Sequence, residues 1–92
     1  MEFLVQIQVN LPADLPASER EALMARERER GLELKAEGTI VRVWRIPGRT
    51  ANVGIWQGPD ADAIHQALLS LPVFPYIDAH VTALATHHLE AT

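Results

Sequence analysis

One glutamate, Glu27, stands where a residue that packs against a sheet would be expected. Helix-forming residues run over 18–37, and residues about one turn apart share a face of a helix. In such steps, a line that begins at Leu23 passes through Glu27 and Gly31 and reaches Leu34. A glycine one turn from a carboxylate leaves room for a ligand beside it. Partial burial would disfavour the charged form of Glu27, which makes this residue a candidate base.

The same helix permits a second interpretation. Arg26 and Arg30 lie near the line of Glu27, where either guanidinium would favour the charged carboxylate and tune its basicity. Alternatively, the charges from Arg26 to Arg30 form a solvent-exposed ladder, and the apolar stripe of the helix is rotated. The rotated stripe would consist of Ala22, Met24, Ala25, Leu32 and Ala36. The sequence alone leaves both interpretations open.

Residues 41–56 predict a central hairpin, because apolar residues alternate on both sides of Pro47-Gly48. Arg45 and Asn52 flank the turn and are candidate ligand-binding groups, although Arg45 could instead pair with an acidic neighbour. Trp44 either packs in the core or forms the wall of a pocket. Strict alternation places Val41, Val43 and Arg45 on one face, and Ile40, Arg42, Trp44 and Ile46 on the other.

The remaining elements position these residues. An alternating strand covers residues 2–9, Ser18 with Glu21 predicts a capping box for the first helix, and Gly38 predicts its end. Asp60 predicts the start of a second helix, and alternation over 76–84 predicts a last strand. The apolar stripe of the second helix is Ala61, Ile64, Ala67, Leu68 and Leu71. We expect one domain over residues 1–92, of the α+β class: a ferredoxin-like split β-α-β fold (βαββαβ) with a four-stranded antiparallel sheet and two helices on one face.

The length, net charge and composition of the chain narrow the range of partners and locations that we expect for the protein. A chain of 92 residues builds a thin core, so we expect the open face of the sheet to be covered by further copies in a homo-oligomer. The net charge of −4 argues against nucleic acid as a partner. The chain has no cysteine, no basic leader and no long apolar run, so we expect a cytoplasmic protein without a membrane span. The adjacent pair His87-His88 lacks a third ligand nearby, and we expect no metal.

Three groups of residues together resemble the muconolactone delta-isomerase family almost from end to end. They are Ala25-Arg26-Glu27; Trp44-Arg45-Ile46 with Gly48-Arg49 and Ala51-Asn52-Val53; and Leu71-Pro72 with Phe74-Pro75-Tyr76 and Asp78. The resemblance implies a ferredoxin-like subunit in a ring-like homo-oligomer, a decamer, with pockets near subunit boundaries and with no metal or organic cofactor.

Several positions depart from the pattern of that family. Met24 stands where a lysine is common, Arg42 where a histidine is common, and Thr50 where a tyrosine is common. Pro47 replaces an alanine, and Trp56-Gln57 replaces a Phe-Asp pair. We expect the changes at Met24 and Arg42 to alter which polar groups reach the pocket, and so to bear on which lactone is the substrate.

The resemblance implies a proton transfer within an unsaturated lactone of aromatic catabolism, on the route to 3-oxoadipate. Such a reaction needs a base that holds and returns a proton, a donor for the developing oxyanion and a cation for the substrate carboxylate. The expected proton shuttle is Glu27. Tyr76, as a second catalytic residue, or Asn52 is expected to donate to the lactone oxygen. The expected binding groups are Arg26 or Arg45 for the carboxylate, with Trp44 and Phe74 as walls.

Two rival functions share the fold. The first is a non-catalytic oligomeric binding or scaffold protein, for which we expect Glu27 to face solvent, or Met24 and Trp56 to fill the pocket. The second is cofactor-free oxygen chemistry, for which the sequence shows no recognised motif.

Overall fold

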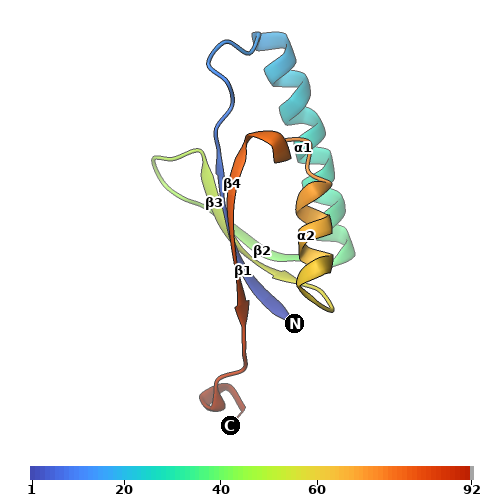
Figure 1. The fold of residues 1–92 in the computed structure, drawn as a ribbon, viewed down its shortest axis with the longest axis vertical. Coiled ribbons are helices and arrows are strands. Elements are labelled where there is room, and N and C mark those ends of the chain that lie inside the picture. The colour runs from blue at the N-terminus through green and yellow to red at the C-terminus, as the bar shows by residue number, and fades with distance from the viewer. Residues whose placement is uncertain (92) are drawn as a thin grey trace.

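The computed structural model describes residues 1–91 and has the predicted order of elements (Figure 1). The strands are β1 (Glu2–Val9), β2 (Ile40–Arg45), β3 (Ala51–Gln57) and β4 (Ile77–Leu84). The helices are α1 (Ala17–Glu37) and α2 (Ala61–Leu69), with short 3-10 turns at Phe74–Tyr76 and His88–Ala91.

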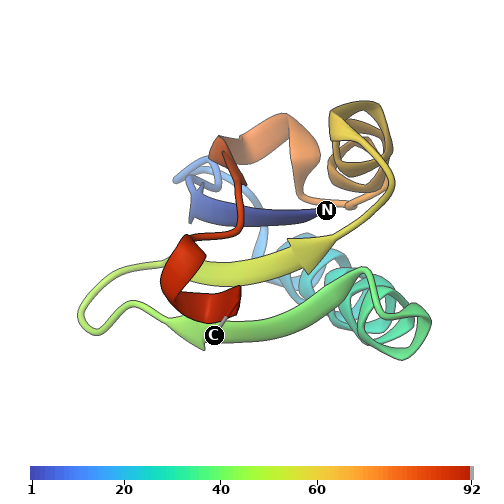
Figure 2. The ribbon, with the colours of Figure 1, turned by 90° about the horizontal axis from the view of Figure 1, so that it is seen from below.

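All pairings in the sheet are antiparallel, and the strand order is β2-β3-β1-β4. Both helices lie on one side of the sheet (Figures 1 and 2), and the segment after β4 leads away from the rest of the chain (Figure 1). The predicted ferredoxin-like fold is therefore confirmed. Its sheet has one face under the helices and one face without a helix among residues 1–91.

The core lies between the helices and one face of the sheet. Its sheet side includes Phe3, Val5 and Ile7 of β1, which are almost fully buried, as the alternation of this strand predicted. Helix α2 adds Ile64, Ala67 and Leu68, and Leu71 follows it into the core. Ala61, the first residue of the stripe predicted for this helix, is exposed.

The interpretation of α1 is settled by burial. Leu23 and Leu34 are the two buried residues of this helix, and Glu27 between them is half-buried. Met24 and Leu32 are 41% and 55% exposed. The line through Leu23, Glu27 and Leu34 therefore faces the sheet, and the rotated stripe is wrong.

Helix α1 begins two residues earlier than the predicted cap requires. Its first residue is Ala17, Pro16 is the N-cap, and no side chain caps this end. Ser18 therefore lies inside the first turn, and its predicted capping box with Glu21 is wrong. The extended backbone of Pro16 provides the entry into the helix, and the Arg20 N–H donates to the Pro16 carbonyl over 2.9 Å. At the other end Gly38 adopts φ 84°, the left-handed cap that was predicted.

A bulge in β2 changes which of its side chains face the helices. The register between β2 and β3 shifts between Ile40 and Arg42. Beyond the shift, Arg45 pairs with Asn52, which pairs in turn with the buried Ile7. Paired residues point to the same face of a sheet, so Ile40 and Arg45 share the helix-covered face with Val43. The expectation that Ile40 shares a face with Arg42 and Trp44 is wrong.

The cap of α2 leads to a stability prediction. The Asp60 carboxylate accepts the Ala63 N–H over 2.8 Å, as the sequence predicted. Asp60→Ala is expected to cost about 1 kcal/mol of unfolding free energy, which lowers Tm by about 4–8 °C in a domain of this size. Calorimetry checks this value, with Asp62→Ala as the control, because Asp62 adds charge to the same first turn without being the cap residue. Equal losses in the two variants would contradict the cap assignment.

Candidate active site

A hollow with a volume of about 800 Å³ lies on the helix-covered side of the sheet. Its wall is formed by helix α1, by strands β1 to β3, and by the segments that follow β1 and α2. Its polar lining residues are Asn10, Arg20, Glu27, Arg45, Thr50 and Asn52. Four of the residues predicted for the site, Glu27, Trp44, Arg45 and Asn52, line this one hollow.

A second hollow, of about 360 Å³, adjoins the first and shares Glu27, Asn52 and three apolar residues with it. Gly31 lines the second hollow, and a Cβ atom added to it would meet no atom within 4 Å. The space that the sequence predicted beside Glu27, at the glycine one turn away, is therefore present. Glu27 lies where the two hollows meet.

The surroundings of Glu27 change its proton affinity. Burial raises the pKa of the Glu27 carboxyl above its ordinary value of 4.5, because desolvation disfavours the carboxylate. The Val73 N–H donates to Glu27 Oε1 over 3.2 Å and partly opposes this shift. Val73 is buried, and its carbonyl accepts the Tyr76 N–H over 2.8 Å, so the 3-10 turn that follows holds the donor in place.

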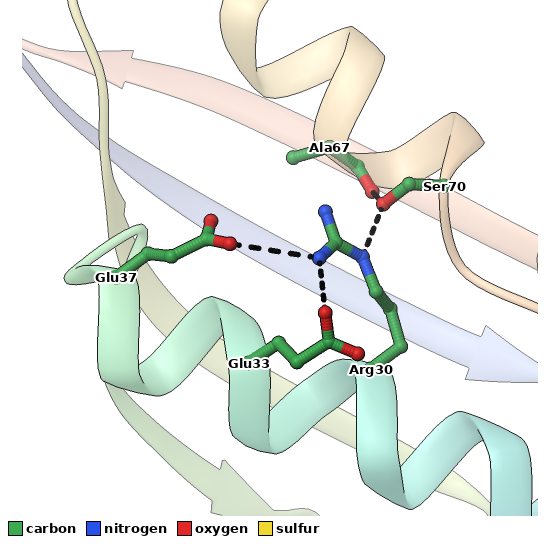
Figure 3. Close-up of polar contacts among 5 residues, drawn as sticks. All are labelled: Arg30, Glu33, Glu37, Ala67 and Ser70. Carbon is green, nitrogen blue, oxygen red and sulfur yellow. Dashed lines mark hydrogen bonds and ion pairs between the residues drawn. The ribbon is translucent and has the colours of Figure 1, made fainter.

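The arginines expected to tune Glu27 do not do so. Arg26 is exposed and lines neither hollow. Arg30 instead joins α1 to α2: its Nε donates to Ser70 Oγ over 2.9 Å, and its Nη1 lies 3.3 Å and 3.7 Å from carboxylate oxygens of Glu33 and Glu37 (Figure 3). The shift of the Glu27 pKa has desolvation as its main cause, and no arginine contributes to it.

Strand β2 contributes Arg45 and Trp44 to the wall of the larger hollow. The pairing of Arg45 with Asn52 and of Asn52 with Ile7 places all three on the helix-covered face. Trp44 pairs with Val53 and belongs to the opposite face, where Arg42 Cζ lies 4.7 Å from its ring centroid. Trp44 therefore contributes at the rim of the hollow, where β2 is an edge strand. Its ring faces away from Glu27.

Phe74 and Tyr76 are not brought to Glu27. Both side chains pack against the core and line neither hollow at Glu27. They lie in the 3-10 turn that follows Val73. Their connection to Glu27 is indirect, through the hydrogen bond that the Val73 N–H donates to it.

Three residues that depart from the pattern of the family, Met24, Arg42 and Thr50, differ in their position relative to the hollow. Met24 lines the hollow, as expected. Arg42 lies over Trp44 on the opposite face and does not line the hollow. Thr50 lines the hollow, but its hydroxyl donates to the Val9 carbonyl over 2.8 Å and accepts from Gln8 Nε2 over 3.0 Å. This hydroxyl therefore holds the hairpin to β1.

Arg20 is a lining residue that the sequence reasoning missed. Its Nη2 donates to the Pro12 carbonyl over 3.4 Å, a long hydrogen bond. Its spacing in the sequence indicates this position, since Arg20 lies three residues before Leu23 and seven before Glu27, on one face of the helix.

No group of three or more His, Cys, Asp and Glu residues is arranged to hold a metal ion within residues 1–91. None of the helices in that range is both long enough and apolar enough to cross a bilayer.

The chain resembles known proteins over nearly its whole length. The family model described as muconolactone delta-isomerase matches residues 1–90. The muconolactone delta-isomerase of Cupriavidus pinatubonensis is 40% identical over 87 residues, which are 95% of each chain. That of Pseudomonas aeruginosa is 38% identical over 87 residues, which cover 95% of this chain and 91% of the relative.

Solved structures agree with the sequence comparison. A crystal structure of muconolactone isomerase superposes with a TM-score of 0.88 at 39% identity, and the match covers 95% of this chain and 91% of the other. A 5-chloro-2-hydroxyhydroquinone dehydrochlorinase from Burkholderia phenoliruptrix has a TM-score of 0.70 at 18% identity, with 97% and 98% of the two chains covered, and so shares the fold. From the family match and these relatives, the chain belongs to the muconolactone delta-isomerase family.

Proposed function

We propose that the protein isomerises muconolactone or a close analogue by moving a proton within the unsaturated lactone, with Glu27 as the proton shuttle and without a cofactor. Membership of the family makes the protein an isomerase. The observation that supports this role of Glu27 is its position: a half-buried carboxylate of raised pKa at the meeting point of two hollows.

The proposed reaction conserves the atoms of the lactone. Glu27 removes a ring proton, and the electron pair of the broken C–H bond spreads through the conjugated system toward the lactone carbonyl oxygen. The same carboxyl group then returns the proton to a different ring carbon, so that only the positions of a hydrogen and a double bond change. The raised pKa favours this role, because a base with too low a pKa removes a carbon-bound proton poorly.

Two neighbours of Glu27 complete the proposed machinery. The Asn52 side chain, which lines both hollows, can donate a hydrogen bond to the lactone oxygen as negative charge develops there. The Arg45 guanidinium lines the larger hollow and can bind the substrate carboxylate at two points. Asn52 and Arg45 are preferred here to Tyr76 and Arg26, which line neither hollow.

The pH dependence of turnover tests this proposal. Purified protein is expected to convert muconolactone, and kcat/KM is expected to fall about tenfold per pH unit below the pKa of Glu27. The midpoint of this fall should lie above 4.5, because protonated Glu27 cannot accept a proton and its pKa is raised. Titration of the lactone carboxyl group without protein separates its ionisation from that of Glu27. Absence of turnover, or a midpoint at or below 4.5, would contradict the proposal.

The binding-protein rival is not supported. It required a solvent-facing Glu27, or a pocket filled by Met24 and Trp56. Glu27 is half-buried in a hollow, Met24 is part of its wall, and Trp56 is 2% exposed within the core.

We also propose that the chain acts as a single ferredoxin-like domain in a cytoplasmic homo-oligomer, with a decamer as the size that the family resemblance implies. The helix-free face of the sheet supports an oligomer, because it carries Trp44 at 44% exposure and the apolar residues Val53 and Ile55 of β3. The absence of cysteine fits a reducing compartment.

A further inference from the structure

We propose that Arg20, acting with Arg45, binds the substrate carboxylate and makes the site selective for lactones that carry a free acid group. This inference rests on the proposed function, because it assigns the anchoring end of the same site. Two arginines, Arg20 and Arg45, and one glutamate, Glu27, line the larger hollow in a chain whose overall charge is −4.

Arg20 and Arg45 come from different walls of this hollow. Arg45 belongs to β2 and projects from the helix-covered face of the sheet, whereas Arg20 lies in the first turns of α1. Within residues 1–91, neither guanidinium lies within 4.0 Å of a carboxylate oxygen, whereas Arg30 has two such neighbours. The hydrogen bond that the Arg20 guanidinium gives to the Pro12 carbonyl is long and exposed. No carboxylate of the described chain therefore forms an ion pair with Arg20 or Arg45, and both remain able to bind an anion in the hollow.

The two arginines can hold an anion without weakening the base. Neither contributes to the pKa of Glu27, which is set by desolvation and by the Val73 N–H. Arg20 lies about two turns of α1 before Glu27, so this cation and the base occupy different parts of the hollow. A substrate with an acid arm at one end and a reacting ring at the other matches this separation.

The positions of three residues on α1 give the order in which a ligand in the hollow would contact them. Arg20, Met24 and Glu27 line the hollow from one helix, and Glu27 lies seven positions after Arg20, about 10 Å farther along the helix axis. Met24 lies between them and presents an uncharged thioether. The helix thus offers a cation, an apolar surface and a base in sequence. A lactone with its acid arm toward Arg20 and its ring between Met24 and Glu27 uses all three.

The test compares two ligands that differ in one charge. Muconolactone and its methyl ester are titrated calorimetrically into a Glu27→Gln protein, in which proton transfer is blocked, and into the same protein with Arg20→Gln added. Arg20→Gln is expected to reduce the preference for the free acid over the ester roughly tenfold, because an exposed charge-assisted contact is lost. Affinity for the ester should change less than twofold, and Arg20→Lys should retain more of the preference than Arg20→Gln.

Arg49→Gln is the charge-matched control, because Arg49 lies in the hairpin turn and lines neither hollow at Glu27. An unchanged preference in Arg20→Gln, an equal loss in Arg49→Gln, or no binding of muconolactone would overturn the assignment. Turnover by the wild-type protein is measured separately. A protein that binds the free acid through Arg20 without converting it would refute the proposed isomerisation alone, and turnover with an unchanged preference would refute the role of Arg20 alone.

Discussion

Replacing Glu27 with glutamine is expected to lower kcat for muconolactone roughly a hundredfold to ten-thousandfold, the range that a positioned acid-base group supplies. Glutamine has almost the shape of glutamate and keeps an oxygen that can accept the Val73 N–H, so the fold should persist. It cannot accept the ring proton. Steady-state turnover followed by the change in ultraviolet absorbance of the lactone measures the effect.

Glu29→Gln is the matched control, since Glu29 is an exposed glutamate of the same helix and lines neither hollow at Glu27. Its kcat should stay within twofold of wild type. If Glu27→Gln also remained within a few-fold of wild type, Glu27 would not be the proton shuttle, and a different group in the hollow would have to be sought.

The same variant also separates catalysis from stability. Because the folded state raises the pKa of Glu27, it binds the proton more tightly than the unfolded chain does. The contribution of Glu27 to stability is therefore greatest below its unfolded pKa and is lost as pH rises through the raised folded pKa. Denaturant unfolding across this window should show the wild type losing stability relative to Glu27→Gln, because glutamine does not ionise.

Gly54→Ala is expected to destabilise the protein by about 1–3 kcal/mol, the range for overpacking in a close-packed interior. An ideal Cβ on Gly54 would lie 2.6 Å from the Arg42 carbonyl oxygen and 3.4 Å from the Val43 Cα. Both atoms belong to the backbone of β2 beside the bulge, so relief requires one strand to move. At about 4–8 °C per kcal/mol, the loss in Tm should be readily measured by calorimetry.

Gly31→Ala provides the control for that substitution. A Cβ on Gly31 meets no atom within 4 Å, and alanine is the better helix former, so this variant should match or exceed the wild type in Tm. A Gly54→Ala protein as stable as wild type would show that β2 and β3 separate at little cost. Because β2 also carries Arg45, movement of this strand should weaken substrate binding as well as stability.

The sequence by itself determined the features that depend on near neighbours in the chain. Alternation and helical spacing predicted the order of the elements, and Asp60 and Gly38 marked helix ends. Each of these rests on contacts within a few residues, which the local pattern encodes. The residues shared with the family then predicted the isomerase, which the comparisons confirm.

Only the tertiary structure decided which side chains meet in the hollow. The Val73 N–H reaches Glu27 across 46 residues of sequence, and the bulge at Ile40 to Arg42 turns the Trp44 ring to the far face. Arg20 joins the site because α1 packs over the ends of strands distant from it in the chain. Such contacts depend on strand register and on the angle of packing, and a one-residue shift reverses a face without changing the local pattern.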